Sequence, residues 1–252
     1  RGLDSEQVER ARSLITAWRE GRVSKYNHLR EYSGPMPERY VLVADQTLGD
    51  ASICHGMAGP ESFHRMLQAA LDENPQCTVV LKIHPDVYSG KKRGHFNVDE
   101  LQDIPRVHVL REDVHPVGLI EQAEAVYVVT SQIGFEALLW GKKVRTFGMP
   151  FYAGWGLTED EIIAPERRGG ASLEQLVHAA LVDYPRYVHP ETMCRCEVEE
   201  IISYLALQRS MRNRFPLVVY ALGFSLYKRH ILRRYFWGSE VRFVRHLNQV
   251  PD

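Results

Sequence analysis

Two side chains that can carry positive charge stand at the end of an apolar stretch, LKIHPDV, at residues 81–87. Successive side chains of a β-strand point to opposite faces, so Lys82 and His84 share one face. Lysine is almost never fully buried unless it is paired. We therefore predict an anionic group, such as a phosphate, beyond the end of this strand. The structural alternatives are a Lys82 that extends its ammonium to water and a His84 that hydrogen-bonds locally.

A second phosphate-binding feature is predicted in TSQIGFEA, residues 130–137, where an apolar strand turns into a helix. As the N-cap, Ser131 would leave free N–H groups at the positive end of the helix dipole, and this arrangement binds phosphate. Thr130 and Gln132 flank it. The alternative is that Ser131 only caps its helix. Glu136, in the second turn, is placed either to reach ribose hydroxyls or to lie solvated on the helix surface.

Two aspartates, Asp45 and Asp50, lie in the loop sequence DQTLGDAS. Loop aspartates commonly form turns. A carboxylate near a bound sugar can also act as nucleophile or general base at a sugar carbon. The residues alone leave both interpretations open for both aspartates.

Other chemistries lack their sequence signatures. No Gly-rich loop for a dinucleotide or for ATP is present. Five histidines have no metal-site spacing, which argues against a metal hydrolase: His55, His64, His95, His108 and His115. The four cysteines follow no zinc or disulfide pattern and predict reduced thiols: Cys54, Cys77, Cys194 and Cys196.

Composition indicates a globular protein of the cytoplasm. The 252 residues are 44% hydrophobic and 25% charged, with a formal net charge of -1. This balance argues against a nucleic-acid partner. No signal peptide opens the sequence, and no apolar run approaches the roughly 18–20 residues of a membrane span.

The elements that must position these residues alternate between short apolar strands and helices. Strands are predicted at 40–44, 78–83, 107–110, 125–129 and 143–147. Helices are predicted at 5–20, 61–74, 98–102, 116–123, 132–140, 172–182 and 197–208. This rhythm is typical of an α/β fold with a doubly wound, mostly parallel, Rossmann-like sheet. Ligands of such a sheet bind beyond the carboxyl ends of the strands, where all the loops above converge.

Two later segments allow alternative interpretations. In MPFYAGWGLTEDE, residues 149–161, Tyr152 and Trp155 either pack at a bend or form a lid that stacks on a sugar. Residues 209–246 contain nine Lys or Arg against one acidic residue, Glu240, and include the apolar run LVVYALGFSLY. This tail is typical either of a membrane-surface segment or of two helices that pack back on the sheet.

Several of these stretches closely resemble the bacterial capsule polysaccharide β-Kdo transferases of the KpsC type. The similarity spans residues 40–234, and its most specific part is GFEALLWGK…TFGMPFYAGWG. The other matching stretches are DQTLGDAS, CTVVLKIHPDV with GKKRGHF, and YPRY. The resemblance implies a metal-independent GT-B glycosyltransferase without a cofactor. It would use CMP-β-Kdo, retain the β configuration and build the Kdo linker on lysophosphatidylglycerol.

The resemblance also implies roles for individual residues. Three residues match the family's Lys-x-His-Pro motif and would bind the CMP phosphate: Lys82, His84 and Pro85. Ser131 matches a phosphate-binding serine. Asp50, the aspartate of Gln-x-x-Gly-Asp, would be the nucleophile, with Asp45 as the second choice. The implied partners are the CMP-sugar donor, a glycolipid acceptor, capsule assembly proteins and the inner membrane surface, where the protein would be peripheral.

The resemblance predicts a division at 1–39 (helix and connector), 40–165 (CMP-sugar-binding domain) and 166–252 (helices and basic tail). The family's catalytic module has two Rossmann-like halves, and little precedes the strand at Tyr40. We therefore expect a fragment or a solitary donor-binding half. Two rival functions are an inactive CMP-binding scaffold of a capsule assembly complex and a sialyltransferase-like enzyme that uses another CMP-nonulosonate.

Overall fold

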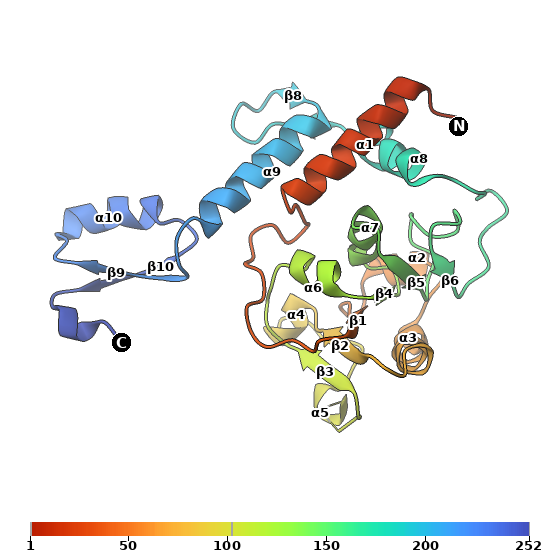
Figure 1. Ribbon diagram of the computed structural model, residues 1–252, viewed down its shortest axis with the longest axis horizontal. Helices are drawn as coiled ribbons and strands as arrows, with labels where there is room; N and C mark the ends of the chain where they lie inside the picture. The colour runs from red at the N-terminus through yellow and green to blue at the C-terminus, as the bar shows by residue number, and fades with distance from the viewer. Residues whose placement is uncertain (1, 102, 252) are drawn as a thin grey trace.

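The sheet at the centre of the molecule confirms the predicted α/β fold. The structure is a computed structural model that describes residues 2–101 and 103–251; for Pro85, Val98 and Glu100 it describes the backbone only. All six strands run parallel in the order β3-β2-β1-β4-β5-β6, as in Rossmann-like sheets (Figure 1). The strands are β1 (Tyr40–Ala44), β2 (Thr78–Lys82), β3 (Val107–Leu110), β4 (Ala125–Val128), β5 (Lys143–Thr146) and β6 (Glu159–Asp160).

Helices cover both faces of this sheet, as a parallel sheet requires. Alternate residues of β1 show the two layers: Val41 and Val43 belong to one apolar core, and Leu42 belongs to the other. The first core contains α3 (Pro60–Glu73), which places Phe63 and Met66 against the strands. The second core lies beneath α1 (Ser5–Glu20), α6 (Val117–Gln122), α7 (Gln132–Leu139), α8 (Leu173–Val177) and α9 (Val198–Asn213). Short helices follow β1 and β2: α2 (Ala51–His55), α4 (Pro85–Tyr88) and α5 (Val98–Leu101).

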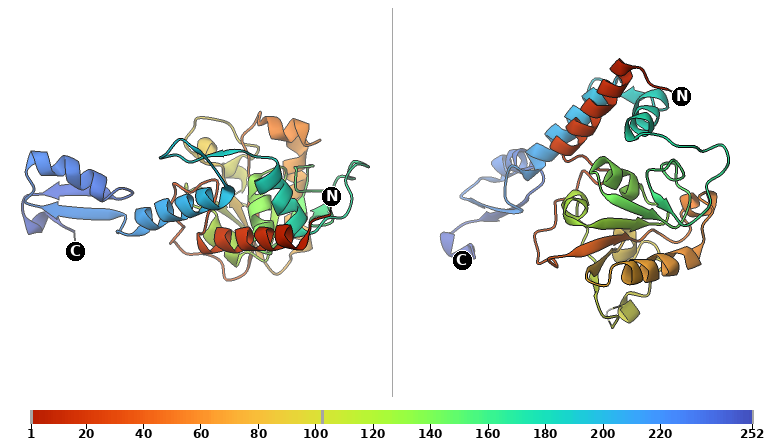
Figure 2. Two further views of the ribbon diagram at one scale, coloured as in Figure 1. Left: turned by 90° about the horizontal axis from the view of Figure 1, so that it is seen from above. Right: turned by 45° about the vertical axis from the view of Figure 1, so that its right-hand side comes forward.

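The first helix and the later helices form one layer. α1 begins at a capping box, in which Asp4 accepts from the Gln7 N–H at 2.8 Å and the Gln7 side chain accepts from the Asp4 N–H. It lies beside α9 and α8 across the second core (Figures 1 and 2). Arg10 reinforces this contact through ion pairs with Glu197 and Glu199. Parts of the predicted segments 1–39 and 166–252 are therefore neighbours in space. The predicted division of the chain at residues 39 and 165 remains a prediction.

Elements after β5 differ from the prediction. The helix expected at 172–182 is α8 followed by a π-helical turn, His178–Asp183. The short strand β6 and the hairpin of β7 (Tyr187–Val188) and β8 (Arg195–Cys196) were not predicted. Each of these three strands has only two residues, which is too few to show the alternation of apolar and polar side chains that identifies a strand. The predicted helix at 98–102 is confirmed as α5, but Gln102 lies outside the described residues.

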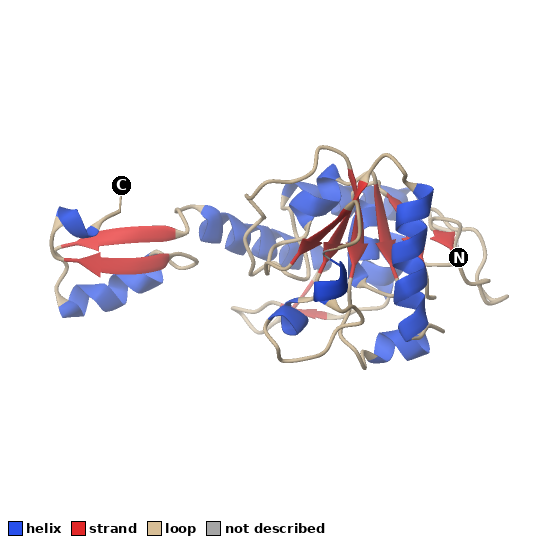
Figure 3. Ribbon diagram, turned by 90° about the horizontal axis from the view of Figure 1, so that it is seen from below, coloured by secondary structure: helices blue, strands red, loops and turns tan. Residues whose placement is uncertain are grey.

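The tail is not the predicted pair of helices packed on the sheet, and the membrane-surface alternative remains a prediction. It is a βαβ unit of β9 (Val218–Leu222), α10 (Leu226–Tyr235) and β10 (Glu240–Val244), with the two strands parallel, followed by a 3₁₀ turn at Leu247–Gln249. It stands at the end of α9, away from the main sheet (Figures 1 and 3). No strand was expected in the apolar run LVVYALGFSLY, and such a short apolar segment fits either a strand or a helix.

Several cations of this tail have partners within the unit. Arg229 and Arg233 lie over the ring of Phe243, at 5.0 and 5.5 Å from its centroid. Arg242 pairs with Glu240 at 2.7 Å. Arg30 ties the unit to the body by donating to main-chain carbonyls of three residues: Arg212, Phe215 and Gly238. Over the described chain, the helices are all too short or too polar to cross a bilayer.

A candidate anion-binding site at the carboxyl edge of the sheet

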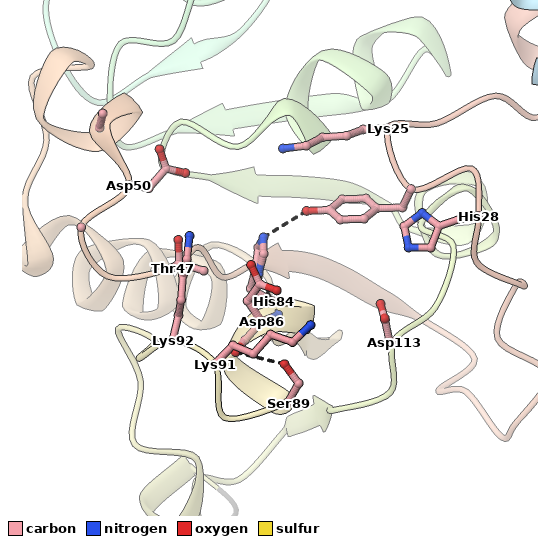
Figure 4. Close-up of a pocket in the computed structure, with 13 residues that line it drawn as sticks. Lys25, His28, Thr47, Asp50, His84, Asp86, Ser89, Lys91, Lys92 and Asp113 are labelled. Atoms are coloured by element: carbon pink, nitrogen blue, oxygen red, sulfur yellow. Dashed lines mark hydrogen bonds between the residues drawn. The ribbon is translucent and has the colours of Figure 1, made fainter. Parts of the chain in front are cut away.

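A pocket of about 640 Å³ opens at the carboxyl ends of β1, β2 and β3 (Figure 4). Its walls come from the loops after these three strands and from the connector between α1 and β1. The lining residues are Lys25, Tyr26, His28, Thr47, Gly49, Asp50, Ala51, His84, Asp86, Ser89, Lys91, Lys92 and Asp113. The pocket thus lies at the edge where a parallel sheet binds ligands.

His84 is fixed in one tautomer by its two hydrogen bonds. Its Nδ1 accepts from the backbone N–H of Asp86 at 3.1 Å. The neutral ring therefore carries its proton on Nε2, which lies 3.2 Å from the hydroxyl oxygen of Tyr26. Burial lowers the pKa of His84, with Asp86 opposing and Lys82 adding to the effect. At neutral pH His84 is consequently an uncharged N–H donor.

Lys82 is a buried cation next to Tyr26, and it does not itself line the pocket. Its residue is only 3% exposed, and its Nζ lies 5.7 Å from the centroid of the Tyr26 ring. Within residues 2–101 and 103–251, no hydrogen bond or ion pair reaches this ammonium group. Burial lowers the pKa of Lys82 to about 8, and the charge of Asp113 opposes that effect. Both Lys82 and His84 thus approach Tyr26, in agreement with the shared face predicted from the strand.

Asp50 faces the pocket from the loop after β1. Its carboxylate caps α2 by accepting from the Ser52 N–H at 2.9 Å. Burial raises the pKa of Asp50, but the Ser52 hydrogen bonds, the Gln46 side chain and the charge of Lys25 together hold it below its ordinary value. Asp50 and Lys25 point into the same space from opposite walls (Figure 4). An ionised carboxylate therefore lies beside the predicted phosphate-binding groups.

Asp45 occupies a different environment from Asp50. It is 4% exposed and does not line the pocket. Burial raises the pKa of Asp45 to about 7, against the opposing backbone N–H groups of Gln46 and His95. Of the two candidate nucleophiles, the geometry therefore favours Asp50, which is partly exposed to the pocket and ionised at neutral pH.

The loop after β4 supports the site without lining it. The backbone N–H of Thr130 donates to the Gln46 side chain at 2.9 Å, and its hydroxyl lies 3.0 Å from that of Ser52. Ser131 caps α7 by accepting from the Ile133 N–H at 3.3 Å. Gln132 is exposed. The capping role of Ser131 is present, while the phosphate roles assigned to these residues remain predictions.

Glu136 is fully buried rather than solvated, and it does not line the pocket. Its carboxylate accepts from the backbone N–H of Lys25 at 2.9 Å. Burial raises the pKa of Glu136 to about 7. The predicted ribose contact remains untested, and the geometry gives Glu136 a different contact, with the connector.

The aromatic residues after β5 are placed mainly by packing. Tyr152 is 0% exposed, and its hydroxyl donates to the carbonyl of Ser131. Trp155 donates to the carbonyl of Phe151 at 2.7 Å, and its ring lies under Arg168. Of the two interpretations, the structure favours packing at a bend for Tyr152. The side chain of Pro85 lies outside the described part of the chain.

Lys25 and Tyr26 were missed by the sequence analysis. They lie in a connector with no regular period, and only the tertiary fold brings them to the carboxyl edge. A neighbouring Lys-Tyr pair in a polar stretch gives no recognisable signal. The described residues contain no group of three or more His, Cys, Asp or Glu placed to hold a metal ion.

The lowered pKa of Lys82 predicts a pH dependence for anion binding. An anion near Lys82 favours the protonated amine. The affinity of the chain for an anion should therefore fall as the pH rises through about 8. Calorimetric titration with pyrophosphate at pH 7 and pH 9.5 measures this loss. Lys82→Arg should remain charged and reduce the pH dependence. An equal pH dependence in wild type and Lys82→Arg would contradict the assignment.

The fold and the pocket together define a Rossmann-like α/β domain with a candidate anion-binding pocket at the carboxyl edge of its sheet. The model of the family described as "Capsule polysaccharide biosynthesis protein" matches residues 7–187. The chain belongs to this family and is a capsule polysaccharide biosynthesis protein of the KpsC type.

Curated relatives support this membership. The chain is 40% identical over 246 residues to the capsule polysaccharide modification protein LipA of Neisseria meningitidis serogroup A, covering 93% of this chain and 35% of LipA. It is 36% identical over 209 residues to the lipopolysaccharide-processing protein LpsZ of Rhizobium meliloti, and this match covers 81% of this chain and 46% of LpsZ. The chain thus spans less than half the length of these relatives.

Solved structures agree with the fold. Thermosulfurimonas dismutans KpsC, a beta Kdo 2,4 transferase, matches with a TM-score of 0.75 and 38% identity, covering 81% of this chain and 64% of that chain. The beta Kdo 2,7 transferase of the same organism's KpsC matches with a TM-score of 0.63 and 31% identity. This match covers 82% of this chain and 63% of that chain.

Proposed function

We propose that this chain is the donor-binding part of a retaining glycosyltransferase that moves Kdo from CMP-β-Kdo onto the Kdo linker of a glycolipid capsule anchor. The observation that carries the proposal is a pocket lined by Tyr26, His84 and Asp50, with the buried Lys82 5.7 Å from the Tyr26 ring and without an ion pair in the described chain. A buried cation is costly unless an anion compensates it, and a nucleotide phosphate in the pocket would do so. The similarity to the two KpsC transferases supports Kdo as the sugar.

The proposed chemistry uses two displacements at the anomeric carbon. In the first, an oxygen of the Asp50 carboxylate attacks, the bond to the phosphate oxygen breaks, and CMP leaves with the electron pair. The Lys82 ammonium stabilises the departing phosphate charge through space, and His84 acts through the Tyr26 hydroxyl that its Nε2–H holds. In the second, an acceptor hydroxyl attacks the anomeric carbon and gives its proton to a general base on the acceptor side of the longer protein. The bond to Asp50 breaks with its electron pair on the carboxylate, which restores the β configuration. The proposal needs no metal ion or cofactor.

The acceptor side belongs to the longer protein in this proposal. Positioning an acceptor against the sugar carbon can account for roughly 7–11 kcal/mol of a barrier. Before β1 the chain contributes one long helix and a connector, with no second sheet to form an opposing wall among residues 2–39. A glycolipid acceptor would bring the protein to the inner membrane surface, beside capsule assembly proteins.

The experiment is incubation of the chain with CMP-Kdo and a Kdo-primed glycolipid, in parallel with the longer protein. We expect the chain to bind the donor and hydrolyse it slowly, and the longer protein to transfer Kdo with retention. Mass analysis of the products measures both. Binding without transfer by the longer protein would indicate a scaffold, and preference for CMP-sialate would indicate a sialyltransferase-like enzyme. Efficient elongation by these 252 residues would refute the expected division between donor and acceptor parts.

A further inference from the structure

The connector between α1 and β1 is held against the pocket by a buried carboxylate. Glu136 in α7 is 0% exposed and accepts from the backbone N–H of Lys25 at 2.9 Å. The next residue is held locally, since the Tyr26 N–H donates to the hydroxyl of Ser24 at 3.2 Å. Asn27 fixes the following turn by donating to the carbonyl of Leu205 at 2.9 Å. The backbone at Lys25 and Tyr26 is therefore anchored from both sides.

This anchoring places two donor groups at the predicted phosphate position. The Lys25 side chain points toward the wall that carries Asp50, and its ammonium has no hydrogen bond within the described chain (Figure 4). Tyr26 lies between the cations of the site: its ring centroid is 5.7 Å from Lys25 Nζ and 5.7 Å from Lys82 Nζ. Its hydroxyl oxygen is 3.2 Å from His84 Nε2.

The tautomer of His84 decides what the Tyr26 hydroxyl can do. Because Nδ1 of His84 accepts from the Asp86 N–H, Nε2 is the donor and the Tyr26 oxygen is the acceptor. The phenolic proton of Tyr26 is then free to be donated to a ligand in the pocket. Burial raises the pKa of Tyr26 to about 12, so this proton is retained at neutral pH.

We propose that Lys25 and Tyr26 bind the phosphate of the donor, that His84 orients the Tyr26 hydroxyl, and that Glu136 is the positioning residue that holds Lys25 and Tyr26 at the pocket. This inference rests on the proposed function for the identity of the ligand and adds a binding element outside the strand loops. A bound phosphate would accept from Lys25 Nζ and from the Tyr26 hydroxyl, and would pair through space with Lys82.

The test compares the affinities of the chain for CMP and for cytidine, because the difference isolates the phosphate. Lys25→Met should weaken CMP binding by about tenfold or more, and Tyr26→Phe by about threefold to tenfold, with cytidine affinity unchanged in both. Two exposed positions far from the pocket give matched controls: Lys228→Met and Tyr184→Phe. Unchanged CMP affinity in folded Lys25→Met and Tyr26→Phe variants would overturn the inference.

Glu136 is tested by rescue and by a spectroscopic signature. Glu136→Ala should weaken CMP binding by about the same factor as Lys25→Met. Glu136→Gln should retain most of the wild-type CMP affinity, because its amide oxygen can accept from the Lys25 N–H. Nitrogen NMR of the His84 ring should show the Nε2–H tautomer in wild type and in Glu136→Gln. If folded Glu136→Gln bound CMP no more tightly than folded Glu136→Ala, the positioning role of Glu136 would be refuted.

Pyrophosphate separates failure of this inference from failure of the proposed function. If wild type binds pyrophosphate but not CMP, the donor assignment fails, while the same substitutions still test Lys25 and Tyr26. If wild type binds CMP and the variants bind it equally well, the donor assignment stands and this inference fails. If wild type binds neither, both fail, and the His84 spectrum still reports whether Tyr26 contacts the ring.

Discussion

Asp50→Asn in the longer protein should lower the proposed Kdo transfer by roughly 10⁴-fold or more, because loss of the proposed nucleophile removes the covalent route. Asparagine is as good an N-cap as aspartate, so the hydrogen bond to the Ser52 N–H and the start of α2 should survive. CMP affinity should not fall, since Asp50 repels rather than attracts the phosphate. Steady-state kinetics and calorimetry measure the two effects, with Asp72→Asn on the exposed face of α3 as the matched control.

The intermediate gives a direct check on the same residue. Mass spectrometry of the longer protein after brief incubation with donor should find Kdo on the peptide that contains Asp50. An adduct on Asp45 would refute the assignment to Asp50 while preserving the double displacement. That outcome would require Asp45, now 4% exposed and outside the pocket lining, to become accessible.

Lys82→Met should stabilise the ligand-free chain and weaken CMP binding by about 1–3 kcal/mol, because the phosphate loses a positive charge that acts on it through space. The difference between the ordinary pKa of 10.5 and about 8 corresponds to roughly 3 kcal/mol of cost for the buried charge. Because the folded-state pKa is depressed, the unfolded chain binds more protons between pH 8 and 10.5. Wild-type stability should therefore rise with pH across that window.

Denaturant unfolding of wild type and Lys82→Met at pH 7 and pH 10 tests this expectation. The gap in unfolding free energy should be widest at pH 7 and should narrow at pH 10, where the wild-type lysine is already neutral in the folded state. Lys142→Met, on the partly exposed turn after α7, controls for a general effect of lysine removal. A Lys82→Met variant less stable than wild type at pH 7 would show that the charge is compensated in the ligand-free chain.

The sheet could be predicted from sequence because its strands are short apolar runs separated by amphipathic helices. β1 and β2 begin where expected, and β2 ends at Lys82, within a residue of its expected end. The fold of the tail could not be predicted from sequence, because strand β9 and the start of α10 share one apolar run. Periodicity fails for such short segments, and only pairing with β10 identifies the strand.

The positions of candidate residues could be predicted at strand ends but not in the connector, and the roles of these residues remain predictions. His84 and Asp50 were placed together because the carboxyl ends of parallel strands share one edge. Lys25 and Tyr26 reach that edge only through the path of the chain after α1, which no local pattern encodes. The burial of Glu136 was unpredictable for the same reason, since the connector covers it.

A structure of this chain with CMP bound is the most direct test of a donor phosphate at the carboxyl edge of β1 and β2. We expect phosphate oxygens within hydrogen-bond distance of Lys25 Nζ and of the Tyr26 hydroxyl that His84 Nε2–H holds, with the cytidine extending along the same pocket. Other cavities offer a clear contrast, such as the one lined by Trp155 and Arg167 or the one lined by Arg30 and Arg212. A phosphate bound in either of these, with the pocket at His84 empty, would contradict the account.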